Sequence, residues 1–157
     1  MAPMQWVLLA YRLPREPSTP RIALWRALRR LGAAQLIDGL VALPADSRTK
    51  EQLQWNADLV VEAGGQATVW VAQPDSRAQQ RAIVGGMRSA VGEEYRLLAG
   101  QADRAHEDAA GSRKRTLGRV RRDLRRIHRR DYFRAPEGDE ARAAVERLAR
   151  SIEEVAA

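Results

Sequence analysis

The sequence contains no cysteine and only two histidines among its 157 residues. Disulfide bonds, a thiolate nucleophile and a His/Cys metal site are therefore excluded. The histidines, His106 and His128, do not lie in a Ser/His/Asp pattern. A metal could use His106-Glu107-Asp108, but such a cluster is more often the polar end of a helix. We expect no resident cofactor and no enzymatic activity.

Long apolar runs are also missing. The first run, residues 6–11, is too short for a secretory signal or a membrane-spanning helix. Hydrophobic residues make up 45% of the chain and charged residues 30%, which is typical of a globular protein with a buried core. We expect a cytoplasmic protein.

What the sequence does have is positive charge concentrated in one segment. Residues 113–134 hold eleven Arg or Lys and two Asp, a local charge of +9, whereas the whole chain carries +7. The remaining residues therefore sum to −2. A near-neutral body with one cationic segment is typical of a protein that binds a polyanion, most often nucleic acid.

The basic segment predicts an amphipathic helix over residues 113–130. At 100° per residue, Leu117, Val120, Leu124 and Ile127 fall within roughly 80° of one another. We expect these side chains to pack on the protein body while guanidinium groups, which bind phosphate bidentately, point outward. The residues predicted to bind nucleic acid are Arg113, Lys114, Arg115, Arg119, Arg121, Arg122, Arg125, Arg126, Arg129 and Arg130.

Other interpretations of this segment remain open. The arginines could form a solvated or internally paired face, or they could contact an anionic membrane surface or an acidic partner. Tyr132 and Phe133 could stack on bases, although a Tyr-Phe pair at a helix end more often anchors a core.

The first 74 residues predict an α+β module. Strands are expected at 5–13, 34–37, 40–43 and 66–72, with helices after Thr19 and after Thr49. Asp38-Gly39 indicates a type I′ hairpin, Thr49 and Gln52 fit a capping box, and Gly32 ends the first helix. The order strand, helix, strand, strand, helix, strand is the ferredoxin-like arrangement. Residues 75–157 predict a helical extension that forms one compact unit with the sheet, with helices over 76–107, over the basic segment after a break at 108–112, and after 138.

Helical and strand spacing also predicts the buried side chains. The residues expected to face the core are Ile22, Trp25, Leu28 and Leu31 of the first helix, Leu53, Ala57, Val60 and Val61 of the second, and the tryptophans Trp6, Trp55 and Trp70.

Several blocks in residues 6–44 and 51–70 resemble the N-terminal domain of ChrB, the bacterial chromate-resistance regulator. They are YRLPREPSTPRI, WRALRRLGA, LIDGLVALP and EAGGQATVW, and the later RRIHRRDYF also fits. The resemblance implies a DNA-binding regulator of a chromate-efflux operon, with chromate as inducer. Full ChrB proteins carry a second, chromate-resistance domain. This chain ends at Ala157, so we expect a lone or truncated N-terminal domain, with a separate chromate-resistance-domain protein as a possible partner.

The sheet region more weakly resembles the central domain of PaaX-type repressors and the CRISPR-associated Cas2-like proteins. Nuclease activity in the latter depends on an aspartate at the end of the first strand. Here that position reads Tyr11-Arg12-Leu13-Pro14, so a nuclease is not expected.

Arg12 and Arg15 follow the first strand and could bind a tetrahedral oxyanion such as chromate, or they could pair with Glu16 or Asp46. The chain is thus interpreted as a homodimeric regulator that binds double-stranded DNA. The alternatives are an adaptor or an oxyanion-sensing protein of chromate resistance that does not bind DNA, and an oxidoreductase acting on chromate, for which the sequence shows no flavin or metal site.

Overall fold

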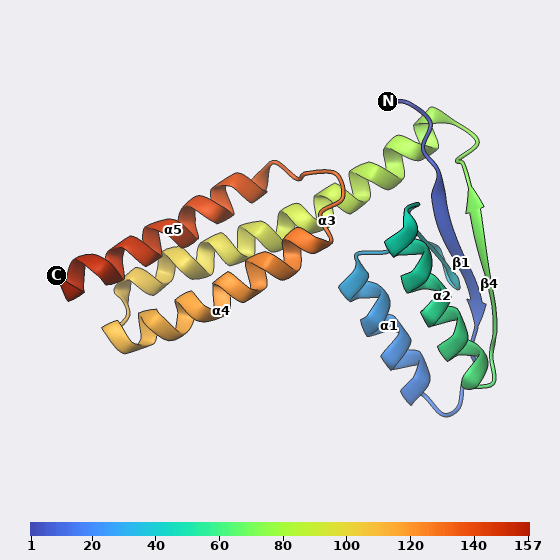
Figure 1. The fold of residues 1–157 in the computed structure, drawn as a ribbon, viewed down its shortest axis with the longest axis horizontal. Helices are drawn as coiled ribbons and strands as arrows, with labels where there is room; N and C mark the ends of the chain where they lie inside the picture. The colour runs from blue at the N-terminus through green and yellow to red at the C-terminus, as the bar shows by residue number, and fades with distance from the viewer. The chain divides into compact units, whose positions relative to one another are not determined.

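The computed structural model describes residues 1–157, which form two compact units, Met1–Met87 and Arg88–Ala157. The boundary between them lies within one long helix, α3 (Figure 1). The elements are β1 Trp6–Arg12, α1 Thr19–Leu31, β2 Ala34–Ile37, β3 Leu40–Pro44, α2 Ser47–Glu62, β4 Gln66–Ala72, α3 Arg77–Arg104, the 3₁₀ helix η1 Ala105–Glu107, α4 Ala110–Arg129 and α5 Glu137–Ala156.

The first unit is built on a four-stranded antiparallel sheet in the order β2-β3-β1-β4. The two helices α1 and α2 lie on the same side of this sheet (Figure 1). This arrangement confirms the predicted α+β class and its ferredoxin-like element order. Because β1 and β3 are the inner strands, β2 and β4 are the edge strands.

Alternate residues of the central strands form the core under the helices. Val7 and Leu9 of β1 and Leu43 of β3 are fully buried, as are Leu53 and Val60 of α2. Successive strand side chains point to opposite faces, so the apolar residues of β1 reach the helices at every second position. Leu53, Ala57 and Val60 confirm the predicted inner face of α2.

The predicted inner stripe of α1 is only partly right. Leu28 is buried as expected, but its partner is Leu24, one turn earlier. Ile22 and Trp25 were expected inside and are instead 47% and 54% exposed. Leu24 and Leu28, four residues apart, form the side of α1 that faces the core. Ile22 and Trp25 lie beside this side of the helix and face solvent.

Three other apolar side chains that were expected in the core are exposed. Trp55 and Trp70 are 56% and 59% exposed, and Val61 lies on the outer side of α2. Trp70 sits on the edge strand β4, where its indole N–H donates to the Thr68 hydroxyl at 2.8 Å. Only Trp6 among the tryptophans is buried.

Turns and caps differ in detail from the expectations. Gly39 has a φ of +80°, but Asp38 does not share a positive φ, so the β2–β3 turn is not type I′. The capping box of α2 pairs Asp46 with Thr49 rather than Thr49 with Gln52, because the helix begins at Ser47. Gly32 ends α1 in the left-handed conformation, as predicted.

The second unit packs the remainder of α3 with η1, α4 and α5 around one apolar cluster. The predicted break at 108–112 is confined to residues 108–109, because α4 begins at Ala110. Gly138, at the start of α5, is buried against the Tyr95 ring. A side chain at this position would place its Cβ 3.1 Å from a carbon of the ring. The buried residues of this cluster are Val91, Tyr95, Leu98, Ala99, Ala102, Ala105, Val120, Ile127, Ala135, Ala141, Ala144, Val145 and Leu148.

Candidate nucleic-acid interface

The helix α4 is anchored by its apolar stripe. Val120 and Ile127 are buried in the cluster of the second unit, and Leu117 and Leu124 pack against it. These are the four residues that helical spacing predicts to face inward. Their burial fixes the rotation of α4 about its axis, and that rotation decides which way the arginines point.

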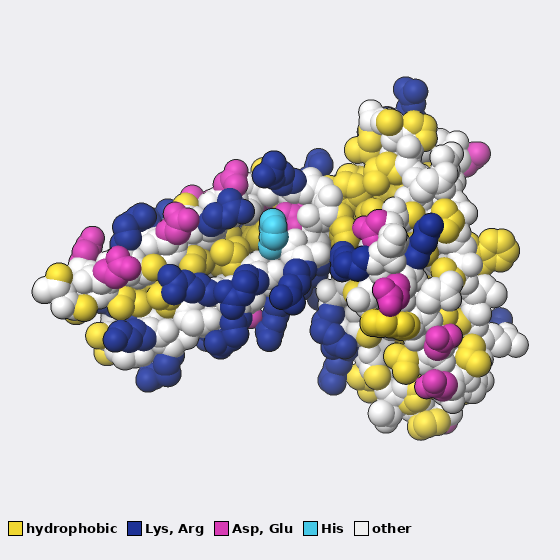
Figure 2. All heavy atoms as spheres, viewed as in Figure 1, with side chains coloured by type: hydrophobic (Ala, Val, Ile, Leu, Met, Phe, Trp, Pro, Cys, Tyr) yellow, Lys and Arg dark blue, Asp and Glu magenta, His cyan; other side chains and the backbone are white.

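Eight basic side chains of α4 are exposed and form what we call the α4 basic face. They are Lys114, Arg115, Arg119, Arg121, Arg122, Arg125, Arg126 and Arg129. Seven of the eight make no ion pair with a carboxylate, the exception being Arg126. Figure 2 shows basic side chains gathered along one side of the helical unit.

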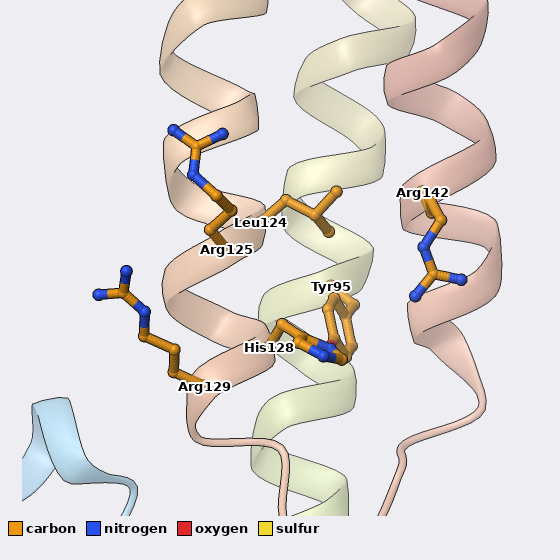
Figure 3. Close-up of a pocket in the computed structure, with 6 residues that line it drawn as sticks. All are labelled: Tyr95, Leu124, Arg125, His128, Arg129 and Arg142. Carbon is orange, nitrogen blue, oxygen red and sulfur yellow. The ribbon is translucent and has the colours of Figure 1, made fainter.

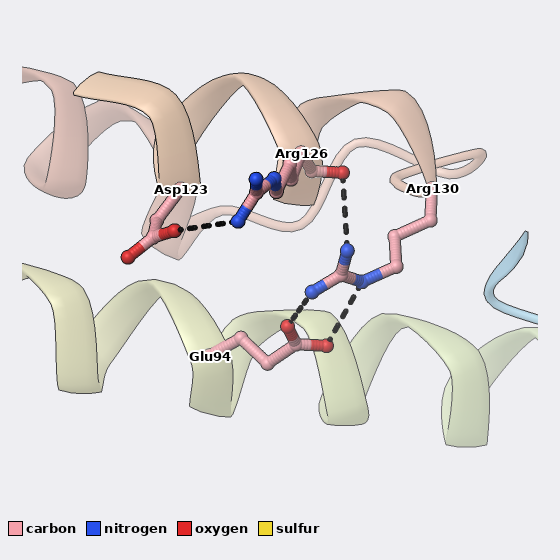
Figure 4. A network of polar contacts seen from close by, with 4 residues as sticks. All are labelled: Glu94, Asp123, Arg126 and Arg130. Atoms are coloured by element: carbon pink, nitrogen blue, oxygen red, sulfur yellow. Dashed lines mark hydrogen bonds and ion pairs between the residues drawn. The ribbon is translucent and has the colours of Figure 1, made fainter. Parts of the chain in front are cut away.

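Arg126 has a weak partner within α4. Its guanidinium lies 3.4 Å from Asp123 Oδ1, and its side chain is 67% exposed (Figure 4). A surface ion pair of this kind contributes little to stability and is easily exchanged for another anion. Arg126 therefore belongs to the α4 basic face.

Arg130, in contrast, is held inside the protein's own network. Its guanidinium forms a two-bond ion pair with the Glu94 carboxylate of α3, and its Nη1 donates to the Arg126 carbonyl at 3.2 Å (Figure 4). The side chain is only 19% exposed. Arg130 is thus placed to join α4 to α3.

Arg113 is also turned away from the basic face. At 100° per residue it falls on the same side of α4 as the apolar stripe. It is half-buried, and its Nε donates to the Asp108 carbonyl at 2.8 Å, just before α4 begins. Of the ten predicted residues, the structure brings eight together and gives Arg113 and Arg130 internal partners.

A cavity of about 360 Å³ adjoins the α4 basic face (Figure 3). The Tyr95 ring and Leu124 form its apolar part, and His128 points toward it from α4, whereas Arg125 and Arg129 line its edge with their guanidinium groups directed away from Tyr95 (Figure 3). Arg142 of α5 lines the other side of the cavity. The sequence did not single out Arg142, because α5 carries charges of both signs. The Tyr95 hydroxyl donates to Asp131, and burial is the main cause that raises the pKa of Tyr95.

Arg12 and Arg15 lie in the first unit, in an open groove of about 860 Å³. Neither pairs with Glu16 or Asp46. Two residues of α1 that sequence reasoning did not select, Arg21 and Arg26, line the same groove. Only six residues separate β1 from α1, so the strand end and the helix start lie near each other, which is the signal that could have found them.

The structure contains no group of three or more His, Asp or Glu side chains that could hold a metal ion. His106 is half-buried in η1 and His128 is exposed on α4. None of the helices is long and apolar enough to cross a membrane.

Comparison with known proteins matches the chain to a family model described as Protein ChrB, N-terminal, over residues 21–110. No curated protein and no solved structure matches the chain. The matched residues run from α1 to the first residue of α4, so most of the α4 basic face lies beyond them. They cover more than half of the chain, which therefore belongs to the ChrB N-terminal family, the chromate-resistance regulators that its sequence blocks resemble.

Proposed function

We propose that the chain is a DNA-binding transcriptional regulator of a chromate-efflux operon, acting in the cytoplasm. The observation that carries this proposal is the α4 basic face, where seven side chains have no carboxylate partner. Membership of the ChrB family supports the regulatory role and the link to chromate. The arginine geometry supports DNA as the partner independently, since it lies largely outside the matched residues.

The charge arrangement on α4 favours a polyanion for an energetic reason. Like charges three and four residues apart on a helix repel by roughly 0.2–0.5 kcal/mol per pair. Pairs such as Arg121 with Arg125 and Arg122 with Arg126 have this spacing, and α4 has only Asp123 to offset them. A phosphate backbone would relieve the repulsion and release counterions from the DNA.

The dimensions of α4 also suit a duplex. Its 20 residues extend for about 30 Å, close to the roughly 34–36 Å of one duplex turn. The eight basic residues are spread from the first turns of the helix to the last. We infer that phosphate contacts provide most of the affinity.

We further propose that the protein acts as a homodimer. Trp70 and Val71 are large apolar residues on the edge strand β4, and they are 59% and 51% exposed. An uncovered edge with such side chains favours pairing with another chain. A two-fold dimer would match operator half-sites related by the same symmetry.

The decisive test is a salt titration of binding to duplex DNA from upstream of the chain's own coding sequence. Replacing Arg121, Arg122, Arg125 and Arg126 by Ala removes four phosphate contacts. The slope of log K against log salt should then fall in magnitude by roughly 3–4. The mass of the free and bound protein, measured in the same solutions, gives the number of chains per duplex.

The matched control replaces Arg77, Arg81, Arg104 and Arg150 by Ala. These exposed arginines form no ion pair, and their loss changes the net charge by the same amount. The control should keep the wild-type slope. If both variants lose affinity equally, the effect is one of overall charge. If wild-type protein does not bind the duplex, the α4 basic face is a solvated or adaptor surface.

Chromate is proposed as the inducing signal on the basis of the family alone. Repeating the titration with chromate at constant ionic strength should weaken wild-type binding. Sulfate at the same concentration is the control, because it is also a tetrahedral dianion.

A further inference from the structure

The first unit carries a second cationic surface, the open groove beside the end of β1. Arg12 is the last residue of β1, Arg15 lies in the loop that follows, and Arg21 and Arg26 belong to α1. We call these four residues the groove arginines. The β2–β3 turn closes the groove, since the Tyr11 N–H donates to the Gly39 carbonyl at 2.8 Å.

The positive charge of this groove is not balanced within the protein. All four groove arginines are exposed, and none forms an ion pair. The one carboxylate in the lining belongs to Asp38, which accepts a hydrogen bond of 3.2 Å from the Gln35 side chain. The lining therefore carries four positive charges and one negative charge, a setting that attracts an anion.

Size and shape distinguish between the anions that could bind. A single tetrahedral oxyanion needs a few donors converging on one point, whereas this groove measures about 860 Å³ and its arginines come from three consecutive segments. Ile22 and Trp25 also line it and are about half exposed. Charged groups spaced along an apolar wall fit an extended chain in which phosphates alternate with sugars.

The Trp25 side chain brings a further cation to the wall of the groove. The Arg29 guanidinium lies 4.8 Å from the Trp25 ring centroid, so one face of the ring already carries a cation. This cation–π contact adds a fifth positive group beside the groove.

We propose that the groove arginines form a second DNA-backbone site, separate in sequence from the α4 basic face. This inference rests on the proposed function, because it assigns a further contact to the same DNA-binding activity. The sequence singled out Arg12 and Arg15 for an oxyanion, but Arg21 and Arg26 stand in no run of charge and were not selected. The groove arginines are spread from position 12 to position 26 and are brought together only by the β1–α1 connection.

The test compares full-length variants in the same salt titration. Replacing the groove arginines by Ala should lower the magnitude of the salt slope by roughly 3–4. Replacing them by Lys keeps the charge and should preserve the slope, while losing the bidentate geometry and some affinity. The Arg77, Arg81, Arg104 and Arg150 variant is again the charge-matched control. Thermal unfolding of each variant shows whether the exposed substitutions leave the fold intact.

The outcomes separate this inference from the proposed function. If the groove variant keeps the wild-type slope while the α4 variant loses it, the groove site is wrong and the proposed function stands. If only the groove variant loses DNA binding, the groove site stands and α4 is not the interface. The last measurement is a calorimetric titration of the wild-type protein and the groove variant with chromate. Chromate binding that the groove variant abolishes, with an unchanged DNA slope, would make the groove a small-oxyanion site and overturn the inference.

Discussion

The Tyr95 hydroxyl of α3 donates a hydrogen bond of 3.0 Å to the Asp131 carboxylate, which lies just beyond the end of α4. The same carboxylate accepts from the Ala135 backbone N–H at 3.0 Å. Asp131 thus connects α3 to the turn that leads into α5. The Tyr95 ring also lines the cavity that adjoins the α4 basic face.

Tyr95→Phe should lower the free energy of unfolding by about 1.5–2 kcal/mol. The substitution removes one hydrogen bond to a charged acceptor but leaves Asp131 with its Ala135 partner, so the acceptor is not orphaned. Urea unfolding of the wild-type and variant proteins measures the difference. An unchanged midpoint would mean that the Tyr95–Asp131 bond contributes nothing net.

The same pair predicts a response to alkali. Burial, followed by the hydrogen bond to Asp131, raises the pKa of Tyr95 above its ordinary value of 10.0. The unfolded chain therefore loses this proton first, and the stabilisation, complete below about pH 10, declines as the pH rises further. The difference in unfolding free energy between wild type and Tyr95→Phe should shrink above about pH 10.

Arg130 and Arg126 carry the same charge but should behave differently when replaced by Ala. Arg130→Ala breaks the two-bond pair with Glu94 and should cost about 1–2 kcal/mol of stability, because both side chains are partly buried. Arg126→Ala removes a longer, exposed contact to Asp123 and should cost less than about 0.5 kcal/mol. Chemical denaturation measures the free energy of unfolding of the two variants, which have the same net charge. Equal losses would contradict the division between structural and surface arginines.

The sequence predicted the parts of this protein that depend on local periodicity. The strand–helix order, the buried stripe of α4 and the left-handed Gly32 all follow from patterns within a few residues. The errors concern features that tertiary packing decides. Trp25 and Trp70 have core-like spacing, yet one lies on the flank of a helix and the other on an edge strand.

The candidate sites divide in the same way, into features that a local sequence pattern predicts and features that tertiary packing decides. The α4 basic face could be predicted because its residues lie on consecutive turns of one helix. The pairing of Arg130 with Glu94 could not, since the two residues are far apart in sequence and meet only through the packing of α3 against α4. The groove arginines depend in the same way on where the chain turns after β1.

Gly39 and Gly85 should respond in opposite directions to the same change. A Cβ on Gly39 would lie 2.6 Å from the Tyr11 carbonyl oxygen, and its φ of +80° is unfavourable for alanine. Gly39→Ala should therefore cost about 1–3 kcal/mol and disturb the wall of the groove. Gly85 lies within α3, where an added Cβ would meet no atom within 4 Å, so Gly85→Ala should stabilise the protein by about 0.5–1 kcal/mol. Thermal unfolding of both variants measures the two shifts. A stabilised Gly39→Ala would show that the turn does not approach β1 as closely as described, and the groove would lose the element that closes it.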